Sequence, residues 1–286
     1  MAVYEQSYHR YDGPLTPLSR RFLVIPRYAY QRLSGSKLLW ALLVVSTLAA
    51  LGSAVLIYLL NNAKLLATLG IEIGGVLAID ASFFAIVLRI QLVIGFLVVL
   101  IAGPPLISMD LANGALPLYL ARPLTRKEYV LGKLTVLAAV LSVITWGYGL
   151  ALWGLQASLA GAAWALENLR IAAGLFVGSW VWILVLSFLT LALSALIRWP
   201  LAVRGVLLVL FLVLPAFGFA LRQILRTPWG QVIDLGADLK AVVTALLGNV
   251  DPDGPPVLGA CLVLAAVVAL SIGVIAARLR AQEVVT

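Results

Sequence analysis

Long apolar stretches separated by short polar segments dominate the chain from residue 38 onward. Each stretch is about 20 residues long or longer, which is the length a helix needs to cross the hydrocarbon core of a bilayer. The pattern predicts an all-α, polytopic membrane protein with six transmembrane helices, over residues 38–60, 83–107, 130–153, 171–197, 203–221 and 257–277. We expect one six-helix transmembrane domain over 38–277, between cytoplasmic tails over 1–37 and 278–286.

The composition supports the same conclusion. Hydrophobic residues make up 63% of the chain and charged residues 11%, and the mean hydropathy is +1.08. Soluble domains are about 45–50% apolar and about 25% charged. A soluble core could not bury this much apolar surface, so the bilayer must be its solvent. The single cysteine excludes an internal disulfide framework.

The distribution of charge sets the expected orientation. A net charge of +8 would by itself suggest nucleic acid, but the basic residues gather on alternate loops. If the N-terminus is cytoplasmic, fourteen of the 20 Lys and Arg residues lie inside, against five of the 12 acidic ones. The positive-inside rule then predicts that both termini are cytoplasmic, and no nucleic-acid partner is expected. The first 37 residues contain no apolar signal-peptide core, which agrees with this orientation.

Two amphipathic segments flank the predicted spans. Residues 20–36 alternate basic with apolar or aromatic residues, which is typical of an interfacial helix or of a basic juxtamembrane tail. Leu235, Leu239, Val242, Val243 and Leu246 recur at helical spacing, opposite a face with Asp234, Asp238 and Ala241. This pattern predicts an outer amphipathic helix before the last span, serving either as a lid over an exit path or for packing.

The polar segment between the second and third spans predicts a short cytoplasmic helix over residues 109–122. Ser108 or Asp110 could cap its start. Thr125 and Glu128 have the spacing of a capping box that begins the third span. A short helix held between two spans at the cytoplasmic face would suit a docking surface for a soluble partner.

Several chemistries are missing from the sequence. The only histidine, His9, lies in the polar tail, and there is no phosphate-binding loop. Carboxylate pairs within the predicted spans are also absent. We therefore expect no enzyme activity, no cofactor and no metal site in this chain. Arg89 is the one charge expected below the outer membrane interface, where it either contacts an anionic substrate group or extends to the headgroups.

One block of sequence points to a family. Asp110 and Gly114 are followed by L-A-R-P at 120–123 and by T-R-K-E-Y-V-L-G-K at 125–133. This block, together with the expected topology, resembles the permease subunits of ABC-2 type ABC transporters. The chain departs from the family pattern mildly, with Asp110 in place of a glutamate and Gly114-Ala115 in place of Gly-Thr.

The resemblance implies a complex of two permease subunits and two ATPase subunits in a bacterial inner membrane. ATP and Mg would be bound by the ATPase, and the second permease would be either an identical or a different chain. The 109–122 helix would couple the chain to the ATPase. The coupling residues would then be Asp110, Asn113, Gly114, Arg122, Arg126 and Lys127.

The cargo implied by the apolar spans is hydrophobic or amphiphilic, and export is favoured. Two alternatives from other classes stay open. One is a structural subunit of a larger membrane assembly that does not transport. The other is an intramembrane enzyme, against which the missing histidine and carboxylate pairs argue.

Overall fold

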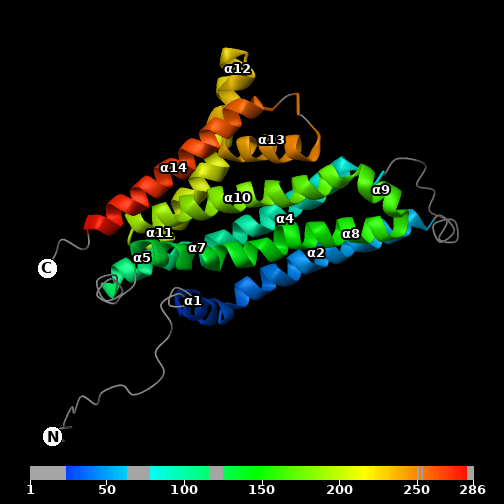
Figure 1. The fold of residues 1–286 in the computed structure, drawn as a ribbon. Helices are drawn as coiled ribbons and strands as arrows, with labels where there is room; N and C mark the ends of the chain where they lie inside the picture. Colours follow the sequence, from blue (N-terminus) through cyan, green and yellow to red (C-terminus); the bar gives the residue numbers. More distant parts are fainter. Residues whose placement is uncertain (1–23, 63–77, 116–124, 250, 253, 282–286) are drawn as a thin grey trace, which may run out of the picture.

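The computed structural model describes residues 24–62, 78–115, 125–249, 251–252 and 254–281. Every regular element in these ranges is a helix (Figure 1). Six helical segments are long and apolar enough to cross a membrane, over Lys37–Asn61, Ala81–Ala112, Arg126–Ala160, Leu169–Leu196, Pro200–Leu225 and Val257–Arg280. The prediction of an all-α protein with six helices of membrane-spanning length is confirmed. Helical ends extend several residues beyond the predicted apolar stretches, most at the third span.

The spans differ in regularity. Three consist of a single helix each: α2 (Lys37–Asn61), α10 (Leu169–Leu196) and α14 (Val257–Ala281). Three are interrupted: α4 (Ala81–Ala102) with α5 (Pro105–Ala112), α7 (Arg126–Ser142) with α8 (Tyr148–Ala160), and α11 (Pro200–Leu208) with α12 (Leu214–Leu225). A π-helical segment joins each of the last two pairs, over Val143–Gly147 and Val209–Val213. Such π segments recur at functional sites.

Four shorter elements lie outside the spans: α1 (Val24–Ser34), α9 (Ala162–Glu167), a 3₁₀ helix over Pro228–Ile233 and α13 (Leu235–Leu247). At one end of the bundle, α1 and α5 lie with the C-terminal end of α14 (Figure 1). We call this the α5 end. The opposite end carries α9, and we call it the α9 end.

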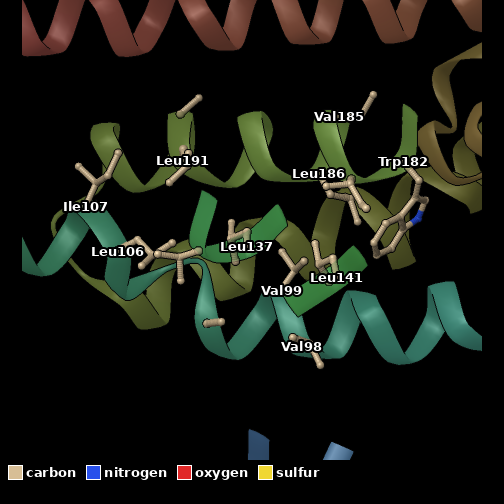
Figure 2. Close-up of a cluster of buried hydrophobic side chains, with 14 of the residues drawn as sticks. Val98, Val99, Leu106, Ile107, Leu137, Leu141, Trp182, Val185, Leu186 and Leu191 are labelled. Atoms are coloured by element: carbon tan, nitrogen blue, oxygen red, sulfur yellow. The ribbon is translucent and has the colours of Figure 1, made fainter. Parts of the chain in front are cut away.

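The core is centred on α10, which packs against α4, α5, α7, α13 and α14. Figure 2 shows apolar side chains of α4, α5, α7 and α10 meeting in one cluster. Ile107 of α5, Leu137 and Leu141 of α7 and Leu186 of α10 are each at most 1% exposed. Close packing of this kind transmits displacement from one helix to the next.

Hydrogen bonds attach α2 to its neighbours, although much of its surface is exposed. Ser46 Oγ donates to Gln91 Oε1 of α4 (2.5 Å), and Asn61 Nδ2 donates to Gln156 Oε1 of α8 (2.7 Å). The hydroxyl groups of Thr47 and Tyr148 also share a hydrogen bond, of 2.7 Å. In apolar surroundings such polar pairs hold helices together where a hydrophobic driving force is missing.

The helix α1 lies within the segment predicted to be amphipathic, and it packs against α7. The Tyr30 hydroxyl lies 3.2 Å from the carbonyl oxygen of Thr135 and 3.3 Å from that of Val136, both as a donor. Ser36 then caps α2, because its side chain accepts from the Leu39 N–H. The helix α1, which precedes the first span, is therefore held against the third span.

The helix α13 forms where the sequence predicts it and ends at Gly248, whose φ of 99° lies in the left-handed region. The prediction of its polar face is wrong. Its three members Asp234, Asp238 and Ala241 are buried, as are four of the five apolar residues opposite, because α13 packs between α10 and α14. Periodicity alone could not show this, because it shows only one apolar face and not a second packing partner.

Two glycines of α10 allow α13 to approach closely. A side chain at Gly174 would meet the Leu246 carbonyl oxygen at 2.8 Å, and one at Gly178 would meet Val243 at 3.5 Å. In these two contacts the residue number increases along α10 while it decreases along α13, so the two helices are antiparallel. At 1.5 Å per residue, α13 spans about 20 Å of an α10 about 42 Å long. The N-terminus of α13 therefore lies near the middle of the bundle.

Candidate functional site

The second span is broken at Gly103-Pro104-Pro105. Prolines have no backbone N–H, so the carbonyl group of Leu100 has no donor at its usual partner, residue 104. The Arg204 side chain of α11 donates to that carbonyl through Nε at 3.0 Å. A charged donor thus replaces the missing backbone bond and ties the end of α4 to α11.

A single hydroxyl group of α10 holds the start of α5. Ser194 Oγ accepts from the N–H groups of Ile107 (3.1 Å) and Ser108 (2.8 Å), and it lies 2.7 Å from the Pro104 carbonyl oxygen as a donor. These N–H groups belong to the first turn of α5 and have no acceptor within that helix. All of these groups are buried, so the break is a firmly connected joint.

The joint also requires a glycine. A Cβ atom at Gly103 would collide with the Thr190 side chain of α10 and would meet the Val99 carbonyl oxygen at 2.9 Å. The close approach of α10 to this turn therefore depends on the missing side chain.

A buried ionic cluster fixes the far end of α5 on α7. Asp110 Oδ2 lies 2.7 Å from Lys133 Nζ and accepts a 2.7 Å hydrogen bond from the Tyr129 hydroxyl. The ammonium group also lies 5.3 Å from the centre of the Tyr129 ring. The Lys133 and Asp110 side chains are only 9% and 16% exposed. A buried charge is tolerated when it is paired and hydrogen-bonded, as both are here.

The structure corrects the predicted helix over residues 109–122. Helix α5 begins at Pro105 and ends at Ala112, so Asp110 and Ser108 lie inside it and cap nothing. Proline is favoured in the first turn of a helix, which explains the earlier start. Gly114 follows the end with a φ of 62°. Residues 116–124, and with them Arg122, lie outside the described residues.

The other predicted coupling residues gather at the α5 end (Figure 1). Asn113 and Gly114 are exposed where α5 ends. Arg126 and the exposed Lys127 lie in the first turn of α7, and the predicted capping box of Thr125 and Glu128 begins this helix.

Among the described coupling residues, only Asp110 lies in the buried cluster. Its partners Tyr129 and Lys133 were not among the predicted coupling residues. Their spacing of four residues places both on one face of α7. A lysine on a face that is otherwise apolar was the signal for a buried ion pair.

A cavity of about 650 Å³ lies between α4, α10, the fifth span, the 3₁₀ helix Pro228–Ile233 and α13. We call it the α13 cavity. Its apolar lining includes Leu92, Phe96, Trp182, Leu186 and Phe211, and its polar lining consists of Arg89, Gln231, Asp234, Lys240 and Thr244. The predicted substrate contact Arg89 thus lies on a cavity that periodicity could not reveal, because elements far apart in the sequence form it.

The charges around this cavity are unequally compensated. Asp234 caps α13 by accepting from the N–H groups of Gly236 (2.9 Å) and Ala237 (3.1 Å). Lys240 pairs with Asp251 at 2.6 Å. Arg89 is exposed and has no hydrogen bond or ion pair within the described ranges. Among the described residues, Arg89 is therefore the one positive charge of the cavity lining without a polar partner.

A second carboxyl group lies one helical turn from Asp234. Asp238 is fully buried, and neither of its oxygens has a hydrogen-bond partner in the described part of the chain. Burial, together with the smaller effect of the nearby negative charge of Asp234, raises the pKa of Asp238 to about 7. Asp238 is not part of the cavity lining.

Among the described residues, no group of three or more His, Cys, Asp or Glu side chains is placed to hold a metal ion. Comparison with known protein families finds no family model that matches the chain, and comparison with curated proteins finds no match either. The two regions of the molecule that bear on function are therefore the α5 end and the α13 cavity.

Proposed function

We propose that this chain is the permease subunit of an ATP-driven ABC transporter of the ABC-2 type, with the α5 end in the cytoplasm and both termini on that side. One observation carries the proposal. Asp110, Tyr129 and Lys133 belong to the block that resembles the family, and they meet in one buried cluster that fixes α5 on α7. A rigid element of this kind could receive force from a soluble partner.

The partner would contact the exposed ends of this element. Asn113 and Gly114 lie at the end of α5, and Arg126 and Lys127 lie in the first turn of α7. Arg126 and Lys127, beside the exposed end of α5, would make polar contacts with this partner. In this proposal Asp110 acts through Lys133 as a positioning residue, and Arg122 would add a further contact.

Displacement at the α5 end would reach the rest of the bundle through the joint. Ser194 connects the start of α5 to α10, and Arg204 connects the end of α4 to α11. A push on α5 and α7 would therefore move α10 and α11 as packed bodies. Two ATPase subunits that close on ATP would in this way tilt a pair of permeases between two states.

The chain itself would perform no catalysis. ATP and Mg would be bound by the ATPase subunits, and a second permease, identical or different, would complete the pathway. Membrane lipids would surround the exposed apolar faces of α2 and α14. The apolar spans support a hydrophobic or amphiphilic cargo, and export is the favoured direction in a bacterial inner membrane.

The test is purification of the tagged chain from its native host in mild detergent, with the co-purifying proteins identified by mass spectrometry. We expect a soluble ATPase with a phosphate-binding loop in equal amount. The double variant Arg126→Glu/Lys127→Glu should lose it, while the control Arg226→Glu, at a different exposed site, should keep it. A large assembly without any ATPase would contradict the proposal and favour a structural subunit.

A further inference from the structure

The α13 cavity has the chemistry of a lipid site. Its walls are largely apolar, and exposed apolar side chains of α4 and the fifth span lie at its edge. Ile86, Val93 and Leu212 are 62%, 58% and 67% exposed and all three line the cavity. In a chain solvated by a bilayer, such side chains face acyl chains. The cavity is therefore open sideways to the membrane.

The polar side of the cavity favours a ligand with a negatively charged group. Asp234 and Lys240 are compensated by the N-terminus of α13 and by Asp251. No described residue pairs with the guanidinium group of Arg89, whose donors match the oxygens of a phosphate group. It lies eight residues into α4, about 12 Å from the helix start. An acidic headgroup at Arg89 would leave its acyl chain to run along the apolar wall toward Trp182.

The volume fits this occupant. At about 650 Å³ the cavity is within the range of sites that enclose small organic ligands. One acyl chain with part of a headgroup would occupy it, with a second chain in the surrounding bilayer. The nearby π-helical segment Val209–Val213 contributes Phe211 and Leu212 to the wall, so an irregular part of the fifth span shapes the site.

We propose that the α13 cavity binds an anionic phospholipid that enters sideways from the bilayer, with its phosphate on Arg89 and an acyl chain against Trp182. Binding itself requires only this chain. That the bound lipid is also the cargo class rests on the proposed transport function. The two claims are tested separately, because the binding experiment uses no ATPase and measures no transport.

The experiment is native mass spectrometry of the purified full chain with dioleoyl phosphatidylglycerol or dioleoyl phosphatidylcholine. We expect one tightly held phosphatidylglycerol, and Arg89→Gln should weaken it about tenfold, as expected for a lost charge-assisted hydrogen bond. The control Arg226→Gln removes an exposed arginine that does not line the cavity and should change nothing. Equal binding of the two lipids, or unchanged binding by Arg89→Gln, would overturn the proposal.

A second measurement locates the acyl chain. Phosphatidylglycerol with brominated acyl chains should quench Trp182 as well as the exposed tryptophans, so the total quenching should be smaller in Trp182→Phe than in the wild type. Glycerol phosphate, which has the headgroup charge without a chain, should not reverse the quenching. Reversal by glycerol phosphate would show a simple anion site and overturn the lipid assignment, as would quenching of equal extent in Trp182→Phe and the wild type.

Discussion

The α5 end and the α13 cavity differ in how their polar groups are paired. At the α5 end, Asp110, Lys133 and Ser194 all have partners within 3.1 Å; Lys133 and Ser194 are buried, and the Asp110 side chain is 16% exposed. Around the cavity, Arg89 has no partner among the described residues, and Asp238 is buried without one nearby. A fully paired polar network makes a structure rigid, whereas unpaired groups are costly unless a ligand or proton compensates them. The α5 end is therefore suited to transmit force, and the α13 cavity is suited to bind a ligand.

The ion pair at the α5 end should give the largest effect on stability. Either Asp110→Ala or Lys133→Ala leaves a buried charge alone, and each should lower the free energy of unfolding by about 3 to 5 kcal/mol. The double variant should lose much less than the sum of the two, because no unpaired charge is left. Equilibrium denaturation in mixed micelles measures this.

The matched control for the ion pair is Lys127→Ala, on the same helix but exposed. It should stay within about 0.5 kcal/mol of the wild type. Additive losses for Asp110 and Lys133 would contradict the pairing.

The joint in the second span should give the next largest effect. Ser194→Ala removes the acceptor of two buried N–H groups and should cost about 1 to 3 kcal/mol. Ser187→Ala provides the control on the same helix, because the Ser187 hydroxyl is buried without a hydrogen-bond partner among the described residues. Its loss should cost almost nothing. Equal destabilisation by both variants would mean that Ser194 does not hold α5.

The buried carboxyl group near the cavity should make stability depend on pH. The pKa of Asp238 is about 7 in the folded chain and about 3.9 in an unfolded one. Between these values the folded protein holds a proton that the unfolded chain has released, so stability falls as pH rises and stays low above 7.

Asp238→Asn should remove this fall. Its midpoint of thermal unfolding should exceed that of the wild type more at pH 8 than at pH 5. An equal difference at both pH values would show that Asp238 is already ionised when folded.

The smallest effect on stability is expected at the cavity edge. Arg89→Gln removes an exposed side chain without a partner in the described ranges, so the free energy of unfolding should stay within about 0.5 kcal/mol of the wild type. Denaturation of both proteins in lipid-free micelles measures this. A loss of more than about 1 kcal/mol would show that Arg89 serves packing, and the contrast between the two regions would be weaker.

The spans could be predicted from sequence because hydrophobic length is a direct consequence of bilayer thickness. The capping box at Thr125 and the ending of α13 at Gly248 were equally predictable, since local backbone chemistry fixes both. Two consecutive prolines explain why the second span is interrupted at 104–105, but the sequence does not show that Ser194 and Arg204 bond the carbonyl groups left there. Those partners lie about 90 and 100 residues away, and no local pattern connects them.

The candidate sites were less predictable for the same reason. Asp110 was identified from a motif, yet the motif did not show that it is paired with Lys133 and Tyr129 rather than exposed. Asp238 was assigned to a polar face because α13 was considered alone, without α14 against it. The cavity at Arg89 depends on how several elements far apart in the sequence are arranged, which a hydrophobic pattern does not contain.

The most direct test of the account is photo-crosslinking in the native host with benzoylphenylalanine at position 113, where α5 ends. The account predicts one major product that contains an ATPase with a phosphate-binding loop. The same probe at position 166, in α9 at the opposite end of the bundle (Figure 1), should give no such product. If position 113 gave no ATPase, or position 166 gave as much, coupling through the α5 end would be contradicted.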